Sequence, residues 1–283
     1  MTDAALVHTQ PYVHANGAAI PCLGLGTWQS SGDEGARAVE AALRTGYRHV
    51  DTAAAYRNEE QVGAALRASG VPRGEIFLTT KVWYDRIGKD DVQRAAEASL
   101  KRLGLEYIDL LLIHWPNPDY TLADTMAGLS AVRREGLARN IGVSNFTVAL
   151  MDEAVRHAAE PLATNQCEYH PYLDQTPVIN ACRAYGMAFT SYSPIGRGAL
   201  LQDATIVRIA EQHGRTPAQI VLRWHIQQPG VVAVPKSVTP ARIAENLAVF
   251  DFELGPAEMD AIFALRRRDG RTISPSWAPT WDT

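Results

Sequence analysis

The chain alternates between short runs of apolar residues and longer stretches in which apolar residues recur every three or four positions. The short runs have the length of strands, and the periodic stretches are typical of helices that cover a sheet. The run over residues 108–113 is almost wholly apolar, which favours a parallel strand covered on both faces. We predict eight strands in this way, at residues 21–25, 49–51, 76–80, 108–113, 140–143, 163–167, 187–191 and 231–234.

Helical stretches separate these runs. The helix predicted over residues 90–103 is the clearest, because Val92, Ala96, Leu100 and Leu103 fall on one face. Thr216 to Gln219 read as a capping box with proline at the first helical position. Asn58 is expected to cap the helix that follows it. The remaining predicted helices cover residues 33–44, 58–69, 122–135, 148–158, 177–185, 241–249 and 256–265, with one more before Thr216.

Eight strand–helix units in a chain of 283 residues predict a single (β/α)8 TIM barrel spanning residues 1–283. A short N-terminal hairpin is expected at 13–20, where Asn16-Gly17 suits a two-residue type I′ turn. The C-terminal tail, residues 266–283, is expected to be irregular. A doubly wound open sheet is the alternative, but Gly24-Leu25-Gly26 lacks the third glycine of the phosphate-binding pattern.

Composition narrows the functional classes. The net charge of −4 is spread along the chain, which favours neither nucleic acid nor an anionic membrane surface as a partner. No apolar run has the length of a spanning helix, and the first residues do not resemble a signal peptide. The three cysteines, Cys22, Cys167 and Cys182, include no C-x-x-C pair, so we expect reduced thiols, a cytoplasmic location and no metal site.

Candidate chemistry gathers where predicted strands end. Asp51, Lys81 and His114 each end or directly follow a strand, and Tyr56 lies in the loop after Asp51. A barrel brings its strand ends together at one mouth. A phenol is a weak acid near neutral pH, so Lys81 is expected to lower the pKa of Tyr56, with Asp51 holding Lys81 in a buried ion pair. His114 would orient a carbonyl oxygen, which Tyr56 would then protonate.

Each of these residues alone also fits a structural role. Asp51 would serve as a loop cap, Tyr56 as a core or rim aromatic, Lys81 as a solvated lysine and His114 as a buried structural histidine. Their occurrence together on successive strand–helix units favours the catalytic interpretation.

The chain resembles the aldo-keto reductases along nearly its whole length. The segments that carry the resemblance are Gly24 to Trp28, Gly46 to Ala53 with Tyr56, Thr80 to Trp83, Leu111 to Pro116, Asn140 to Phe146, Asn165 with Gln166 and Glu168, Ser191 to Pro194, and Pro235 to Thr239 with Arg242, Glu245 and Asn246. The short segment between His114 and Ser144 and the tail after Arg271 are similar to those of bacterial 2,5-diketo-D-gluconate and methylglyoxal reductases. The resemblance implies a barrel that uses NADPH without a Rossmann domain, with Tyr56 as the general acid and Asp51, Lys81 and His114 completing a tetrad.

The same resemblance implies where the cofactor lies. Ser144, Asn145 and Gln166 would bind the nicotinamide carboxamide, and Tyr192 would stack on the ring. Lys236, Ser237 and Arg242 would hold the 2′-phosphate, for which a guanidinium and an ammonium are suitable ligands. Glu245 and Asn246 would face the adenine. The remaining residues assigned to the cofactor are Thr27, Ser193, Ile195, Val238 and Thr239.

The substrate pocket is expected to contain Trp28, Trp83, His114, Trp115 and Trp277. Two placements of the tail, with its Trp277 and Trp281, stay open: it folds over the mouth or packs on the outside. The leading hypothesis is a monomeric, cytoplasmic reductase of small dicarbonyls, keto sugar acids or keto esters. The alternatives are a non-catalytic NADPH-binding regulatory subunit on the same fold and an enzyme that prefers NADH, against which Lys236 and Arg242 argue.

Overall fold

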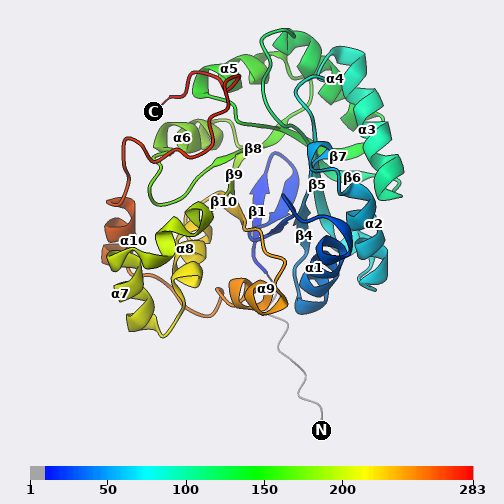
Figure 1. The fold of residues 1–283 in the computed structure, drawn as a ribbon. Helices are drawn as coiled ribbons and strands as arrows, with labels where there is room; N and C mark the ends of the chain where they lie inside the picture. Colours follow the sequence, from blue (N-terminus) through cyan, green and yellow to red (C-terminus); the bar gives the residue numbers. More distant parts are fainter. Residues whose placement is uncertain (1–9, 283) are drawn as a thin grey trace.

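Eight parallel strands form the centre of the computed structural model, which describes residues 10–282, and they pair in sequence order from β3 to β10 (Figure 1). Two isolated parallel bridges, Leu23 to Ala233 and Gly26 to Lys236, join the first strand segment to the last and close the ring. The predicted (β/α)8 barrel is thereby confirmed. The strands are β3 (Leu25–Gly26), β4 (His49–Asp51), β5 (Phe77–Val82), β6 (Ile108–Ile113), β7 (Ala138–Ser144), β8 (Leu162–Glu168), β9 (Ala188–Tyr192) and β10 (Val231–Val234).

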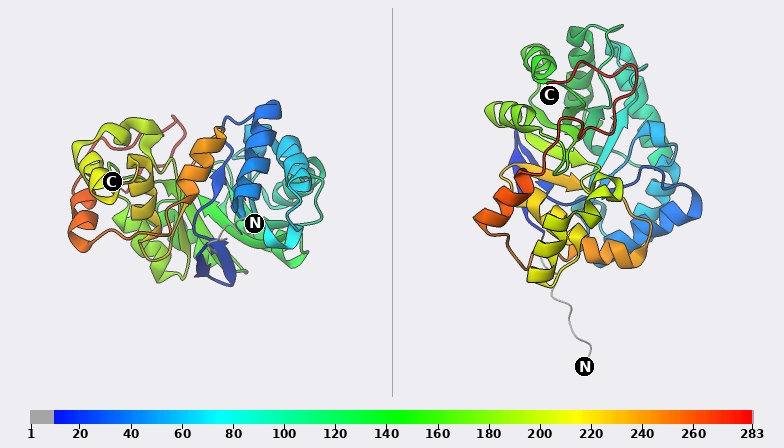
Figure 2. Two further views of the ribbon diagram at one scale, coloured as in Figure 1. Left: turned by 90° about the horizontal axis from the view of Figure 1, so that it is seen from below. Right: turned by 60° about the vertical axis from the view of Figure 1, so that its left-hand side comes forward.

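Helices surround the ring on its outside, as Figures 1 and 2 show. Each predicted helix is present with its ends moved by two residues or fewer. Three short 3-10 segments, η1 (Ala54–Tyr56), η2 (Arg73–Glu75) and η3 (Gly196–Gln202), lie in connecting loops. The helices are α1 (Gly32–Thr45), α2 (Glu59–Ala68), α3 (Lys89–Leu103), α4 (Leu122–Arg134), α5 (Val148–His157), α6 (Thr176–Ala184), α7 (Ala204–His213), α8 (Pro217–Ile226), α9 (Pro240–Leu247) and α10 (Pro256–Phe263).

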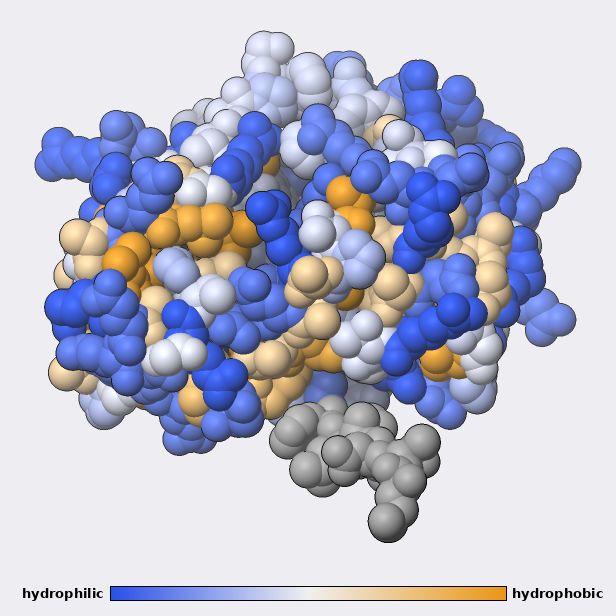
Figure 3. Space-filling view, turned by 60° about the horizontal axis from the view of Figure 1, so that its bottom comes forward, coloured by the Kyte–Doolittle hydropathy of each residue, from blue (hydrophilic) through white to orange (hydrophobic). Residues whose placement is uncertain are grey.

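The core lies between the ring and the helices. Every residue of β6 is buried, as expected for a strand covered on both sides. The inner face of α3 buries Val92, Ala96, Leu100 and Leu103, and burying a side chain the size of valine or leucine stabilises the fold by about 1.5–3 kcal/mol. The outer faces carry the polar residues, so hydrophilic side chains dominate the surface in Figure 3, with smaller hydrophobic areas between them.

The N-terminal hairpin covers one end of the barrel. Its strands are β1 (Tyr12–Ala15) and β2 (Ala18–Pro21), and Asn16 and Gly17 have the positive φ values, 46° and 88°, that a type I′ turn requires. Ala15, Ala18 and Ile20 pack against residues inside the ring, among them Leu110 and Leu112. The hairpin and the C-terminal tail lie at opposite ends of the barrel (Figure 2, left), so the accessible mouth is at the carboxyl ends of the strands.

Three local predictions were wrong. The strand predicted at 21–25 is reduced to Leu25–Gly26, because Pro21 belongs to the hairpin and Leu23 makes only an isolated bridge. Lys81 lies inside β5, not after it. Asn58 precedes α2 but does not cap it with its side chain. The amide of Asn58 instead donates to the carbonyl oxygens of Thr27 and Ser30, at 2.8 and 2.9 Å.

No helix within residues 10–282 has both the length and the apolar character needed to cross a membrane.

Candidate active site

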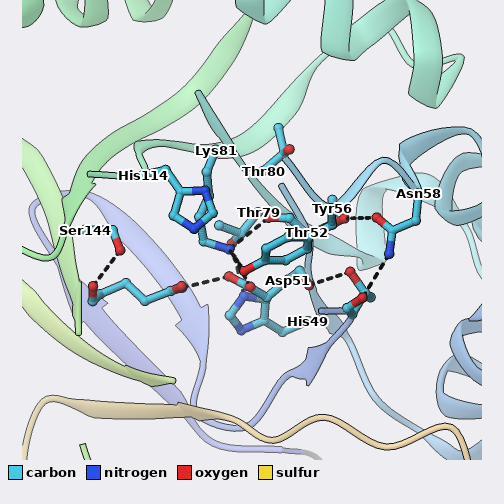
Figure 4. A network of polar contacts seen from close by, with 12 residues as sticks. His49, Asp51, Thr52, Tyr56, Asn58, Thr79, Thr80, Lys81, His114 and Ser144 are labelled. Carbon is cyan, nitrogen blue, oxygen red and sulfur yellow. Dashed lines mark hydrogen bonds and ion pairs between the residues drawn. The ribbon is translucent and has the colours of Figure 1, made fainter. Parts of the chain in front are cut away.

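Asp51, Tyr56, Lys81 and His114 meet at the mouth of the barrel, although they lie on or after three different strands (Figure 4). The Lys81 ammonium lies 2.6 Å from Oδ1 of Asp51 and 2.8 Å from the carbonyl oxygen of Thr52. Its third contact is the Tyr56 hydroxyl, at 3.4 Å. Lys81 has no solvent-accessible surface, so these three oxygens replace water as its hydrogen-bond acceptors. The predicted buried ion pair is present.

Backbone geometry places Tyr56 over this pair. The chain leaves β4 at Asp51 and turns through η1, where the backbone N–H of Tyr56 donates to the carbonyl oxygen of Ala53. Arg57 then takes a left-handed conformation with φ of 56° before α2 begins. This turn returns the Tyr56 ring to the strand ends, with the Lys81 ammonium 5.0 Å from the ring centre.

His114 stands edge-on to two aromatic rings. Its ring centre is 5.6 Å from that of Tyr56 and 5.1 Å from that of Trp83. Burial and, after it, the Lys81 charge hold the pKa of His114 well below its usual value. His114 is therefore neutral at pH 7 and offers one N–H donor. Its Nδ1 atom is buried and has no partner within the described residues.

The electrostatics of Tyr56 differ from the prediction. Burial raises the pKa of the Tyr56 hydroxyl, and the neighbouring Lys81 charge offsets only part of that rise. The expectation of a net lowered pKa is therefore wrong for this structure. Burial also lowers the pKa of Lys81, but Asp51 and Tyr56 together raise it by more. At neutral pH the site thus holds a protonated phenol beside a charged ammonium, which is the protonation state of a proton donor.

A hydrogen-bond network joins this tetrad to the next three strands. The Gln166 amide, on β8, donates to Oδ2 of Asp51 at 2.7 Å. Ser144, at the end of β7, donates to the carbonyl oxygen of Gln166 at 2.7 Å. Asn145 donates to the carbonyl oxygen of His114 at 2.9 Å and accepts from the Tyr192 hydroxyl at 2.7 Å. The predicted nicotinamide residues and the predicted tetrad therefore form one connected group.

A cleft of about 690 Å³ opens above these residues. Asp51, Tyr56 and His114 line it, while Lys81 lies buried beneath. Of the other predicted site residues, the cleft is lined by Thr27, Trp28, Trp83, Trp115, Asn145, Gln166, Tyr192, Ser193, Ile195, Lys236 and Arg242. The predicted residues outside its lining are Ser144, Ser237, Val238, Thr239, Glu245, Asn246 and Trp277.

These outlying residues have other contacts. Glu245 accepts a hydrogen bond from the Thr216 hydroxyl at 2.7 Å and so helps fix the start of α8, whose predicted capping box is present. Asn246 is buried on α9. Ser237 accepts from the backbone N–H of Thr239 at 3.2 Å. Their assignment to the cofactor stays a prediction.

The tail runs along the rim of the mouth at the carboxyl ends of the strands, which is nearer to the first of its two predicted placements. The backbone N–H groups of Thr272 and Ile273 donate to the buried carboxylate of Glu168, at 3.0 and 2.9 Å, and Ile273 lines the cleft. Trp277 stacks on Tyr84 at 5.6 Å, and the ring of Trp281 lies 6.0 Å from that of Trp115. Trp277 thus lies at the rim and is not among the residues that line the cleft, so its assignment to the substrate pocket stays a prediction.

Sequence reasoning missed several lining residues, including Arg57, Arg197 and Ile273. The position of Arg57 directly after Tyr56 was an available signal. Nothing in the pattern around Ile273 pointed to the cleft, because the tail has no periodicity.

The cleft fits a phosphorylated dinucleotide. Lys236 and Arg242 line it together, and neither forms an ion pair or a side-chain hydrogen bond within residues 10–282. Two unneutralised cations on one wall are suited to a phosphate. Within the same part of the chain, no group of three or more His, Cys, Asp or Glu side chains has the arrangement of a metal site.

Comparison with known proteins identifies the family. The sequence profile described as "Aldo/keto reductase family" matches residues 22–267. The chain belongs to the aldo-keto reductase family. The chain is 41% identical to methylglyoxal reductase DkgB of Salmonella typhi, over 93% of this chain and 99% of that protein.

Solved structures of related proteins support the same family assignment. A protein provisionally assigned as 2,5-diketo-D-gluconic acid reductase B superposes with a TM-score of 0.95 at 46% identity, covering 97% of this aldo-keto reductase and 98% of that chain. A Bombyx mori aldo-keto reductase in complex with NADP gives a TM-score of 0.88 at 37% identity, covering 95% and 96%. The predicted family, the oxidoreductase class and, at the level of the family, the NADP(H) cofactor are confirmed.

Proposed function

We propose that this aldo-keto reductase reduces small aldehydes and ketones to alcohols with NADPH, with dicarbonyls, keto sugar acids and keto esters as its substrates. The observation that carries the proposal is the Tyr56 hydroxyl, 3.4 Å from the Lys81 ammonium and beside neutral His114, in a cleft walled by Trp28, Trp83 and Trp115. A proton donor and a neutral imidazole therefore lie side by side in this cleft, with ring centres 5.6 Å apart, and a carbonyl oxygen would lie between them.

Each residue of the tetrad has a separate role in this proposal. His114, being neutral, donates one N–H to the carbonyl oxygen and orients it. Tyr56 transfers its proton to that oxygen as negative charge develops there. Lys81 stabilises the phenolate that results, because an ammonium at 3.4 Å favours the anion. Asp51 keeps Lys81 charged and in place.

Bound NADPH supplies the hydride that reduces the carbonyl carbon. Asn145 and Gln166 would hold its carboxamide, Tyr192 would pack on the ring, and Lys236 with Arg242 would bind the 2′-phosphate. These residues all line one cleft, so a single NADPH molecule would contact both groups. Two cations for the phosphate favour NADPH over NADH.

We also propose that the protein acts as a monomer in the cytoplasm. The family resemblance supports the monomer. Cys22, Cys167 and Cys182 are buried free thiols and form no disulfide, which supports a reducing compartment.

The proposed function is tested with the Tyr56→Phe variant. NADPH oxidation would be followed with methylglyoxal, a diketogluconate, a β-keto ester and an aromatic aldehyde, and NADPH binding would be measured separately by fluorescence titration. Removing the general acid should lower kcat by at least about 100-fold and leave the Kd for NADPH nearly unchanged.

The matched control is Tyr107→Phe, because Tyr107 directly precedes β6 and so lies at the opposite end of the barrel. A fully active Tyr56→Phe variant would refute the assigned acid. If the wild-type protein binds NADPH but turns over no carbonyl compound, the non-catalytic regulatory subunit becomes the better description.

A further inference from the structure

Positively charged side chains outnumber negatively charged ones in the lining of the cleft. Among residues 10–282, four cations line it, namely Arg57, Arg197, Lys236 and Arg242, and Asp51 is the single carboxylate. Both oxygens of Asp51 already accept hydrogen bonds, one from Lys81 and one from Gln166. Asp51 therefore does not neutralise the cations at the mouth, and the cleft favours anionic ligands.

Two of the four cations have a role in the cofactor proposal, and a third lies against an aromatic ring. Lys236 and Arg242 are proposed to bind the 2′-phosphate. Arg197 lies in the loop after β9 that also carries Ser193 and Ile195, and its guanidinium sits 5.1 Å from the centre of the Trp28 ring. Arg57 is the remaining cation of the lining, and neither the cofactor proposal nor an aromatic ring within the described residues accounts for it.

Arg57 is held beside the proposed general acid. It directly follows Tyr56, and its left-handed backbone conformation is uncommon for a residue with a side chain. Its backbone N–H donates to the carbonyl oxygen of Ala54 at 3.2 Å, which fixes its Cα at the rim of the cleft. The guanidinium is exposed and forms no ion pair or hydrogen bond within the described residues.

The neighbourhood of Arg57 does contain carboxylates. Arg57 also borders a second hollow of about 610 Å³ next to α2 and α3, whose wall includes Glu60 and Asp85. Asp85 lies 3.9 Å from Arg86 instead, and neither acid pairs with Arg57. The guanidinium thus stays available to a ligand.

We propose that Arg57 binds a carboxylate on the substrate, and that the enzyme therefore favours carbonyl compounds that carry a carboxylate near the reacting group. The proposal rests on carbonyl reduction at this cleft, which it narrows to one substrate class. A carbonyl group placed against Tyr56 and His114 lies in the same cleft that Arg57 lines. The planar guanidinium can hold a carboxylate through two parallel hydrogen bonds, while the tryptophans that wall the cleft contact the apolar part of the substrate.

The test compares pairs of substrates in which a carboxylate is replaced by its neutral methyl ester. The pairs are 3-carboxybenzaldehyde with methyl 3-formylbenzoate, and 4-carboxybenzaldehyde with methyl 4-formylbenzoate. We expect the wild-type enzyme to have the higher kcat/KM for the acid of at least one pair, and added salt to reduce that preference. Arg57→Gln should lower the acid-to-ester ratio of kcat/KM by about tenfold, and Arg57→Lys should retain part of the preference.

Two other arginines provide controls. Arg86→Gln removes the same charge from the neighbouring hollow, which Arg86 lines without lining the cleft, and should leave the ratio unchanged. Arg197→Gln removes another cation from the lining of the cleft, one that lies against the Trp28 ring. An unchanged ratio in Arg57→Gln, or an equal loss in Arg197→Gln, would overturn the assignment to Arg57.

A binding measurement separates this inference from the proposed reaction. Because Trp28, Trp83 and Trp115 line the cleft, binding of the alcohol product 3-(hydroxymethyl)benzoate should quench tryptophan fluorescence without turnover. Arg57→Gln should weaken that binding and leave binding of the methyl ester unaffected. If neither aldehyde is reduced but the acid product still binds through Arg57, the reductase proposal fails and the carboxylate site stands. If the acid and the ester bind equally well, the carboxylate site is refuted.

Discussion

The buried ion pair between Asp51 and Lys81 leads to a specific prediction about the stability of the protein. Asp51→Asn keeps the shape of the side chain but removes the counter-charge 2.6 Å from the Lys81 ammonium. Lys81, which has no accessible surface, would then keep only the Thr52 carbonyl oxygen and the Tyr56 hydroxyl as acceptors. Breaking a buried pair by removing one partner destabilises a protein by about 3–5 kcal/mol, since the other charge stays buried and uncompensated.

The assay is chemical and thermal unfolding at several pH values. A loss of about 3–5 kcal/mol, at about 2 °C per kcal/mol for a chain of this size, lowers Tm by about 6–10 °C at pH 7. In the wild type the pKa of Lys81 is raised by its partners, so its contribution to stability is complete below the unfolded pKa of about 10.4 and is lost as pH rises through the folded pKa.

The variant should show the opposite dependence on pH. Without Asp51, burial lowers the pKa of Lys81, so the unfolded chain binds more protons than the folded one at neutral pH. The deficit in stability relative to the wild type should therefore shrink as pH rises towards the ordinary pKa of lysine. The double variant Asp51→Asn/Lys81→Met removes both charges and should recover most of the loss.

A matched control is Asp85→Asn, since Asp85 and Arg86 are an exposed pair 3.9 Å apart, and such pairs contribute at most about 1 kcal/mol. If Asp51→Asn is as stable as this control, or if the double variant is no more stable than the single one, Asp51 does not stabilise the fold by compensating the buried charge of Lys81.

Two further predictions concern the tail and the packing of the helices. Glu168→Gln should loosen the tail, because a neutral amide is a poorer acceptor for the N–H groups of Thr272 and Ile273. Hydrogen exchange at these two amides should accelerate. Unchanged protection would contradict the role of this contact, the Glu168 clasp, in holding the tail. Hydrogen bonds from His170 and the tail outweigh burial and lower the pKa of Glu168, so in the wild type the clasp should persist at neutral pH and be lost only as pH falls through that lowered value. Gly63→Ala should destabilise the fold by about 1–3 kcal/mol through overpacking, because a Cβ there would lie 1.9 Å from the Leu103 carbonyl oxygen. The free energy of unfolding would be measured by chemical denaturation, with Gly74→Ala as the control because nothing lies within 4 Å of a Cβ at that position. Equal stability of the two variants would rule out the close approach of α2 to α3.

The local pattern of apolar and polar residues was enough to predict most of the strands and helices. Strands β4, β6 and β10 have the predicted bounds, because a buried parallel strand is a short apolar run and its neighbours along the chain are amphipathic helices. The barrel follows from the number and order of these units. The tetrad was also accessible from the sequence, because the carboxyl ends of all strands in a barrel meet at one mouth however far apart they lie in the chain.

Other features depend on contacts between distant segments, and no local pattern records them. The partners of Asn58 are backbone carbonyls in the loop after β3, so its side chain does not cap α2. The net pKa of Tyr56 depends on how far burial outweighs the Lys81 charge, and burial is a property of the whole fold. The tail shows the same limit: its aromatic residues were evident in the sequence, but its position was decided by Glu168, more than 100 residues away. The sequence by itself determined which chemical groups stand at the mouth; the packing of the folded chain decided their protonation, their partners and the wall that surrounds them.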